Sequence, residues 1–295
     1  MKSDTIHILG AGSIGLLLAT RLTPVAAVVL IRRAGAHPPC VTLTLQEDAA
    51  DYRFDIAQTS ADRLQRPIER LIVCTKAYDA LPAVQSLGAQ LQADAALLLM
   101  QNGMSSQEEI TAALPQASIY AASSTEGAYR PAPGCVRHAG RGITRIGRIQ
   151  GQKQDWVGLF QAAALQSQIA EPIRWHLANK LRINALINPL TVLHDCRNGE
   201  LLERPKARTE MQRLGEEVDR ILQAAGYHFD DSAYQQAAAV ASATSANLSS
   251  MLQDARAGRR LELDAITGYL LRLADEYAID APANRALYAS LRQPD

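Results

Sequence analysis

The sequence predicts an α/β N-terminal domain built on a parallel sheet, followed by a second, all-helical C-terminal domain. Up to about residue 125, short apolar runs alternate with helical patterns. The runs of strand length are residues 6–9, 25–31, 71–74, 95–100 and 118–122. Several are apolar at successive positions, as is typical of parallel strands that helices cover on both faces. Alternating apolar residues within 135–149, interrupted by glycines, predict one or two antiparallel strands appended to this sheet.

The helical domain is predicted by the loss of strand patterns after about residue 171. Within residues 210–225, apolar side chains recur at helical spacing: Leu214, Val218, Ile221 and Leu222. Pro172 marks the expected boundary. We therefore expect two domains, residues 1–171 and residues 172–295, each long enough to bury a core of its own.

The composition disfavours several classes of function. Lysine plus arginine and aspartate plus glutamate both number 30, so the chain lacks the basic excess of a nucleic-acid-binding protein and small-molecule partners are expected. No apolar run approaches the ~20 residues that span a bilayer, and the N-terminus lacks a signal-peptide pattern, so we expect no membrane partner and a cytoplasmic location. The four cysteines form no Cys-x-x-Cys pair and the six histidines have no metal-ligand spacing, so no metal site is expected.

A glycine-rich turn carries the first functional prediction. The expected strand at residues 6–9 runs directly into Gly-Ala-Gly-Ser-Ile-Gly and then into a helical pattern. Glycines at this spacing permit the tight turn, the approach of phosphates to the backbone, and the packing of helix on strand, while the helix N-terminus receives the negative charge. The pattern predicts a Rossmann-type dinucleotide site formed by Gly10, Ala11, Gly12, Ser13, Ile14 and Gly15.

The form of the dinucleotide follows from the next strand. An NAD site typically has a carboxylate about 20 residues after the glycines, which binds the ribose 2′-hydroxyl. NADP sites have arginine there instead. No carboxylate occurs between Thr5 and Gln46, and Arg32 and Arg33 end the second predicted strand. NADPH/NADP+ is therefore the expected cofactor, although solvated loop cations would give the same pattern.

Two further turns follow predicted strands, at the end of the sheet where α/β proteins bind ligands. Lys76 lies in Cys-Thr-Lys and could contact a cofactor phosphate, and Asn102 lies in Gln-Asn-Gly and could bind ribose, nicotinamide or substrate. Each could equally be an ordinary turn residue.

A polar stripe interrupts an otherwise apolar helical segment. Lys180, Asn184 and Asn188 are spaced by four among leucines and isoleucines, so they share one face of the helix. Burying an unpartnered amide costs about 1–3 kcal/mol and an ammonium more, so the stripe should face a ligand or a wet cleft. A lysine there could donate a proton, since burial readily lowers its pKa. The alternative is a lysine that extends to solvent beside asparagines near Pro189.

Blocks along nearly the whole chain resemble the ketopantoate reductases. They are Leu9-Gly10-Ala11-Gly12-Ser13-Ile14-Gly15, Cys74-Thr75-Lys76-Ala77, Gln101-Asn102-Gly103-Met104, the helix with Asn179, Lys180, Asn184, Asn188 and Pro189, Ser249-Ser250-Met251-Leu252-Gln253-Asp254, and Arg260-Leu261-Glu262-Leu263-Asp264. Residues 123–133 match the family's pattern only loosely. Without the resemblance, Glu262 would read as a surface carboxylate and the two serines at 249 and 250 as a helix N-cap pair.

The resemblance implies an NADPH-dependent reduction of 2-dehydropantoate to pantoate, on the route to pantothenate and coenzyme A. By position, Lys180 matches the family's general acid and Glu262 the carboxylate that holds substrate and supports the lysine. Asn102 matches a residue at the junction of cofactor and substrate. The residues that match the family's substrate-binding positions are Asn184, Asn188, Asn247 and Ser250.

Two alternative functions fit the same pattern. One is the NADPH-dependent reduction of a different small 2-oxo acid, because pocket contacts choose the side chain. The other is a non-catalytic NADP-sensing protein, against which Lys180 and Glu262 argue, because a sensor needs no proton donor. The sequence is compatible with a monomer or a homodimer.

Overall fold

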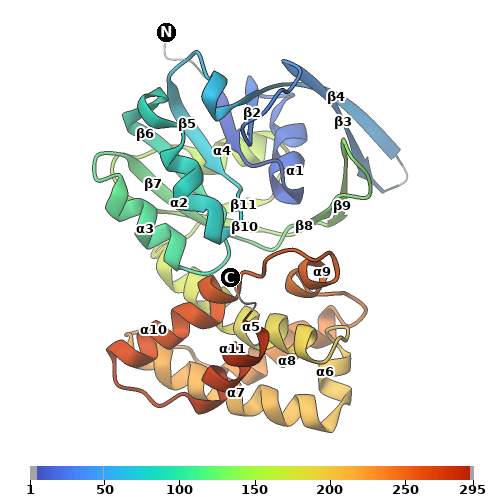
Figure 1. The fold of residues 1–295 in the computed structure, drawn as a ribbon, viewed down its shortest axis with the longest axis vertical. Coiled ribbons are helices and arrows are strands. Elements are labelled where there is room, and N and C mark those ends of the chain that lie inside the picture. Colours follow the sequence, from blue (N-terminus) through green and yellow to red (C-terminus); the bar gives the residue numbers. More distant parts are fainter. Residues whose placement is uncertain (1–4, 49, 293–295) are drawn as a thin grey trace. The chain divides into compact units, whose positions relative to one another are not determined.

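The computed structural model describes residues 5–48 and 50–292, which divide into two compact units (Figure 1). Unit 1 comprises the chain up to Gln101 together with Ser106–His176. Unit 2 comprises Asn102–Ser105 together with the chain from Leu177 onward. The expected fold class, an α/β Rossmann-type unit and a helical unit, is confirmed.

Unit 1 is built on one mixed sheet of eleven strands within the described residues, in the order β11-β10-β7-β6-β5-β1-β2-β4-β3-β9-β8. The strands are β1 (Ile6–Leu9), β2 (Val28–Arg32), β3 (Cys40–Glu47), β4 (Ala50–Ser60), β5 (Ile68–Val73), β6 (Leu91–Leu99), β7 (Ser118–Ser124), β8 (Gly127–Tyr129), β9 (Cys135–Gly140), β10 (Thr144–Gln150) and β11 (Ser167–Ile169). The block from β7 through β1 to β4 is parallel. The strand order reverses beside β1, which is where open α/β sheets bind ligands.

Helices cover both faces of the sheet in unit 1. They are α1 (Ser13–Leu22), α2 (Ala77–Gln85), α3 (Ser105–Ala113) and α4 (Trp156–Ala162), with short 3₁₀ turns at Ala61–Arg63 and Gly88–Gln90. Successive strand residues point to opposite faces, so Ile72 joins the core with α1 and α4 whereas Leu71 joins the core with α2 and α3. This two-sided burial explains why the central strands are apolar at successive positions.

The five predicted central strands are confirmed as β1, β2, β5, β6 and β7, and β10 is an antiparallel addition beside β7. Strands β3 and β4, which pair antiparallel with each other, were not predicted from the sequence. Much of β4 is exposed at its N-terminal end, where Tyr52 is 50% exposed. A strand with so little buried surface lacks the apolar run on which the other predictions rested.

Unit 2 is helical. Its helices are α5 (Ile173–Leu193, whose first turn belongs to unit 1), α6 (Glu200–Glu203), α7 (Pro205–Ala224), α8 (Ala233–Ala243), α9 (Ser250–Arg256), the π-helix η3 (Asp264–Gly268), α10 (Tyr269–Glu276) and α11 (Pro282–Leu291). The amphipathic α7 starts with proline at its N-terminus and packs against α8, α10 and α11. None of the described helices is both long and apolar enough to span a bilayer.

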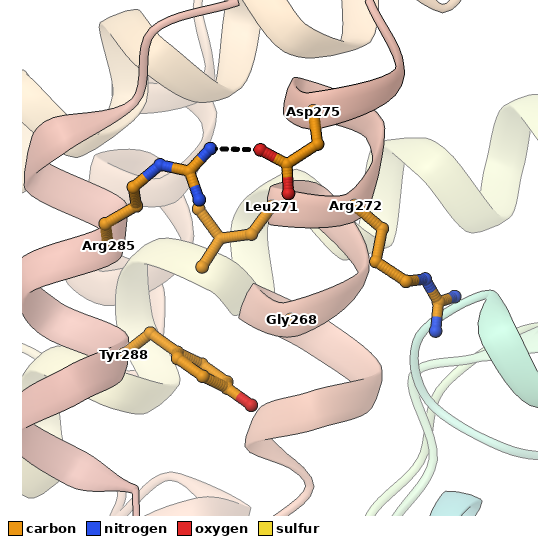
Figure 2. A pocket seen from close by; sticks show the side chains of 6 residues that line it. All are labelled: Gly268, Leu271, Arg272, Asp275, Arg285 and Tyr288. Carbon is orange, nitrogen blue, oxygen red and sulfur yellow. Dashed lines mark hydrogen bonds and ion pairs between the residues drawn. The ribbon is translucent and has the colours of Figure 1, made fainter.

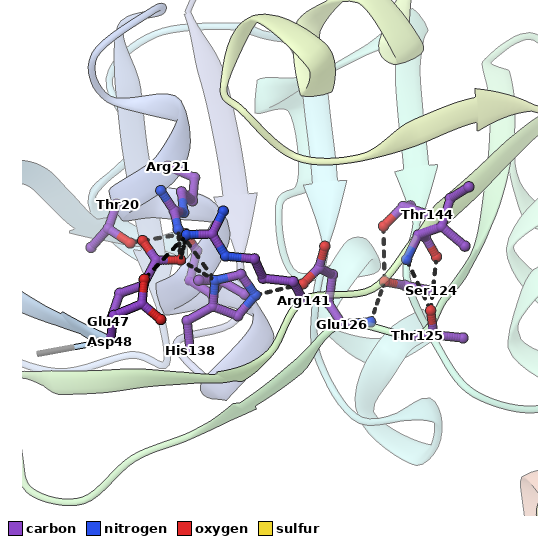
Figure 3. Close-up of polar contacts among 12 residues, drawn as sticks. Thr20, Arg21, Glu47, Asp48, Ser124, Thr125, Glu126, His138, Arg141 and Thr144 are labelled. Carbon is purple, nitrogen blue, oxygen red and sulfur yellow. Dashed lines mark hydrogen bonds and ion pairs between the residues drawn. The ribbon is translucent and has the colours of Figure 1, made fainter. Parts of the chain in front are cut away.

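A buried charged cluster joins the outer strands of unit 1 to α1 (Figure 3). His138 on β9 bonds Glu47 Oε1 through Nδ1 at 2.9 Å and Glu126 Oε2 through Nε2 at 2.6 Å. Arg21 of α1 pairs with Glu47, and Arg141 Nη2 lies 3.1 Å from the same oxygen. Burial opposes the ionisation of Glu47, but the hydrogen bonds and charges of its three partners outweigh burial and lower the pKa of this carboxyl. His138 thus links two carboxylates within unit 1.

We expect Glu47→Gln to lower the free energy of unfolding by about 2 kcal/mol or more, because it leaves the largely buried Arg21 guanidinium without its charged partner. A lowered native pKa stabilises the fold above the carboxyl's unfolded pKa, and this stability disappears as pH falls through the native value. The free energy of unfolding, measured by urea denaturation, should therefore differ most between wild type and variant at neutral pH. In acid this difference should disappear. Glu109→Gln, at an exposed position of α3, is the matched control. A difference that does not change with pH would contradict this account.

Candidate functional site

The glycine turn joins β1 to α1 with almost no space between its parts. Gly10 has a φ of 109°, and a Cβ there would lie 2.9 Å from the backbone nitrogen of Thr75. A Cβ on Gly15 would lie 2.0 Å from the carbonyl oxygen of Gly10. Any side chain at either position would force the backbone apart, so only glycine allows this strand–turn–helix geometry.

The N-terminus of α1 fits the phosphates of a dinucleotide. Its N-cap residue is Gly12, without a side-chain cap, and its first turn holds no acidic residue. The positive end of the helix therefore meets no carboxylate of its own first turn, as anion-binding helix N-termini require. Arg130, within the loosely matching residues 123–133, reaches this turn and its Nη1 donates to the carbonyl of Ala11 at 3.3 Å.

The basic residues expected around the cofactor differ in their surroundings. Arg32 is half-buried at the end of β2, and its Nη1 donates to Gln58 Oε1 at 3.1 Å. The Arg33 side chain is 87% exposed and pairs with Asp79 Oδ2 at 2.7 Å. Lys76 is half-buried at the N-cap of α2. Arg32 and Arg33 are therefore not equivalent candidates for binding the 2′-phosphate of the cofactor.

Unit 2 brings together three of the predicted site residues. Glu262 is buried just before the π-helix η3, and Asn102 Nδ2 donates to its Oε2 in a long hydrogen bond of 3.4 Å. Lys180 lies in the middle of α5, where burial lowers its pKa from 10.5 to about 8, while the negative charge of Glu262 acts in the opposite direction. A lysine with such a pKa holds its proton at neutral pH and releases it readily.

The remaining predicted substrate residues lie on α5 and at the start of α9. Asn184 is half-buried and Asn188 buried, one and two turns after Lys180 on the same face of α5. Asn247 and Ser250 are exposed. The N-cap of α9 is Ser249, whose Oγ accepts from the backbone of Leu252, so the capping alternative applies to Ser249 and not to Ser250.

Gly103 is a further residue of this site, to which no sequence pattern gave a role. It has a φ of 80°, and a Cβ there would lie 2.2 Å from the carbonyl oxygen of Ala265 in η3. This contact packs the turn that carries Asn102 directly on the helix that follows Glu262. π-Helices are rare in proteins overall, but those that occur are often found at functional sites. The sequence signal that could have indicated this close packing is the glycine directly after Asn102.

Residues that anchor the loop before α9 were also missed. The backbone N–H of Asn198 donates to the carbonyl of Asn247 at 3.0 Å, and its side-chain Nδ2 donates to Thr244 Oγ1 at 2.9 Å. The next residue, Gly199, donates to the carbonyl of Ser245 at 3.1 Å. These contacts join segments nearly 50 residues apart, for which the sequence carries no local pattern.

A pocket of about 330 Å³ lies between α10 and α11 (Figure 2). It is lined by Gly268, Leu271, Arg272, Asp275, Arg285 and Tyr288. Arg285 and Asp275 pair with each other, and the Tyr288 hydroxyl donates to Asp264. Because neither Lys180 nor Glu262 lines this pocket, it is separate from the predicted catalytic residues. Among the described residues, no group of histidine, cysteine and acidic side chains could hold a metal ion.

A Rossmann-type sheet with a glycine turn in one unit and a lysine–carboxylate pair among amides in the other indicate the class of protein, an oxidoreductase. The family model for ketopantoate reductase PanE/ApbA matches residues 6–151, and the model for the C-terminal part of the same family matches residues 172–295. The chain belongs to the ketopantoate reductase family.

Individual relatives agree over the full length. The chain is 32% identical over 300 residues to the 2-dehydropantoate 2-reductase of Vibrio cholerae, covering 97% of this chain and 96% of the relative. The crystal structure of a probable 2-dehydropantoate 2-reductase from Bacillus subtilis is similar, with a TM-score of 0.84, 30% identity and coverage of 97% and 98%. The ternary structure of D-mandelate dehydrogenase with NADH and anilino(oxo)acetate shares the fold, with a TM-score of 0.86, 19% identity and coverage of 97% and 96%.

Proposed function

We propose that this protein reduces 2-dehydropantoate to pantoate with NADPH, on the route to pantothenate and coenzyme A in the cytoplasm. The observation that carries the proposal is the Lys180 ammonium, whose pKa burial lowers to about 8, in the same unit as Glu262 and Asn102. Full-length relatives named 2-dehydropantoate 2-reductase support the choice of substrate. In this proposal, residues 1–171 hold the cofactor and residues 172–295 supply the acid and most substrate contacts.

In the proposed reaction, the site residues have separate roles in hydride transfer, protonation and substrate binding. A nicotinamide cofactor bound at the glycine turn supplies the hydride for the ketone carbon. Lys180 stabilises the negative charge that develops on the ketone oxygen and donates its proton there. Glu262 favours the charged form of Lys180 and so keeps the proton available, and the Asn102 amide restrains the Glu262 carboxylate. Asn184, Asn188, Asn247 and Ser250 bind the polar groups of the substrate.

The charge distribution near β2 supports NADPH as the cofactor. Arg32 lies where the ribose of an adenine dinucleotide would approach, at the carboxyl end of the strand that follows the glycine turn and its helix. Its partner is a neutral amide, so its positive charge stays available to a 2′-phosphate. Lys76, at the start of α2, would add a second positive charge for the cofactor phosphates.

The test is to follow NADPH absorbance with 2-dehydropantoate and with a panel of other 2-oxo acids, and to repeat the series with NADH. We expect the highest kcat/KM for 2-dehydropantoate with NADPH. Equal use of both cofactors would contradict the role of Arg32 in selecting NADPH, and no oxidation with any 2-oxo acid would favour a non-catalytic NADP-sensing protein.

A second candidate function is the reduction of a bulkier 2-oxo acid. The fold similarity to D-mandelate dehydrogenase motivates it, since that enzyme's structure holds anilino(oxo)acetate in the same architecture. An aromatic 2-oxo acid in the panel, such as phenylglyoxylate, separates the two. A higher kcat/KM for phenylglyoxylate than for 2-dehydropantoate would replace the first proposal with the second.

A further inference from the structure

Arg32 is held by the side chain of Gln58 on β4. In the parallel pairing of β2 with β4, Gln58 is opposite Leu30 and Ser60 is opposite Arg32. Residues two apart in a strand share a face, so Arg32 and Gln58 project from the same side of the sheet as diagonal neighbours. This register brings Arg32 Nη1 to 3.1 Å from Gln58 Oε1.

The orientation of the Gln58 amide is fixed from the other side. Gln58 is 5% exposed, and its Nε2 donates to the carbonyl of Pro38 at 2.9 Å. Its backbone N–H donates to the carbonyl of Pro39 at 2.8 Å. A carbonyl only accepts hydrogen bonds, so the NH₂ group must face Pro38 and the Oε1 atom must face Arg32. The acceptor for the guanidinium is thus set before any ligand binds.

The neutral partner leaves Arg32 with its charge and most of its donors. Among the described residues, the bond to Gln58 is the only hydrogen bond of the Arg32 guanidinium, which has five N–H groups. Arg33 differs from Arg32, because Asp79 neutralises its charge and because its side chain is mostly exposed. Of the two arginines, Arg32 is therefore the one that is both oriented and uncompensated.

We propose that Gln58 is a positioning residue that presents the charged Arg32 guanidinium to the 2′-phosphate of NADP and thereby sets the preference for NADP over NAD. The inference rests on the proposed function, in which NADPH is the cofactor. Gln58 contributes orientation without opposing charge, whereas a carboxylate at the same position would hold the guanidinium but neutralise it.

The experiment uses calorimetric titration with two probes, adenosine 2′,5′-bisphosphate and adenosine 5′-monophosphate. We expect Gln58→Leu to weaken binding of the bisphosphate about tenfold, as expected when a hydrogen bond that orients a charged group is lost, and to leave the monophosphate unchanged. Gln58→Glu should weaken bisphosphate binding at least as much. In turnover, both variants should raise KM for NADPH while leaving KM for NADH and both kcat values unchanged.

Gln150→Leu is the matched control, because the Gln150 side-chain amide, like that of Gln58, donates to the backbone of unit 1, here to the carbonyls of Leu114 and Ala117. It should lose comparable stability without any change in the ratio of the two affinities. Equal binding of both probes by wild type would overturn the NADPH proposal and this inference together. A preference for the bisphosphate that both Gln58 variants retain would overturn this inference alone.

Discussion

Lys180→Ala is expected to lower kcat for the 2-oxo acid by ~10²- to 10⁴-fold, the usual contribution of a positioned general acid. The variant removes the proposed proton donor and the positive charge proposed to stabilise the developing oxyanion, and it leaves the glycine turn intact. Stopped-flow measurement of NADPH oxidation, with cofactor binding measured separately, checks this. Undiminished turnover in the variant would remove Lys180 from the mechanism.

The pH dependence of kcat tests whether Lys180 is the proposed acid rather than only a positive charge. Because the donor must be protonated, kcat for reduction should fall as pH rises through the Lys180 pKa of about 8. Lys180→Arg keeps a positive charge, but arginine does not lose its proton in this range. The arginine variant should therefore be slow at every pH and lack this decline. A decline that persists in Lys180→Arg would assign the titration to another group.

Gly15→Ala is expected to abolish cofactor binding at any practical concentration and to lower the free energy of unfolding by about 1–3 kcal/mol. The added Cβ would lie 2.0 Å from the carbonyl oxygen of Gly10, so the first turn of α1 must move away from β1. Quenching of tryptophan fluorescence by NADPH and thermal unfolding measure the two effects. Gly140→Ala is the matched control, since its Cβ would meet no atom within 4 Å. Normal NADPH affinity in Gly15→Ala would contradict the role of the turn.

The central sheet was predictable because each buried strand had to be apolar at nearly every position. The segments that became β3 and β4 were not predictable in this way, since their stability comes from pairing with each other and with β2 and β9 rather than from an apolar run. Helical periodicity sufficed for α7, where one face is buried. Nothing local predicts the π-helix η3, which depends on what packs against it.

The site residues also differ in whether a local sequence pattern could predict them. Residues on one element, such as Lys180, Asn184 and Asn188, could be grouped from their spacing alone. The contact between Asn102 and Glu262 joins positions 160 residues apart, and the sequence indicated these two residues separately, Glu262 only through the family resemblance, without predicting that they meet. Gln58 was invisible for a different reason: its importance depends on strand register, which a single sequence does not specify.

The four residues Asn102–Ser105 give the two units an interleaved connectivity. The chain passes between the units at Gln101/Asn102, at Ser105/Ser106 and at His176/Leu177. No single cut therefore separates them, and a fragment that begins near residue 172 would lack both the amide donor to Glu262 and the glycine that packs on Ala265. Exchange of unit 1 between relatives by simple fusion at residue 172 would thus import a foreign piece of unit 2, residues 102–105, together with every new unit 1.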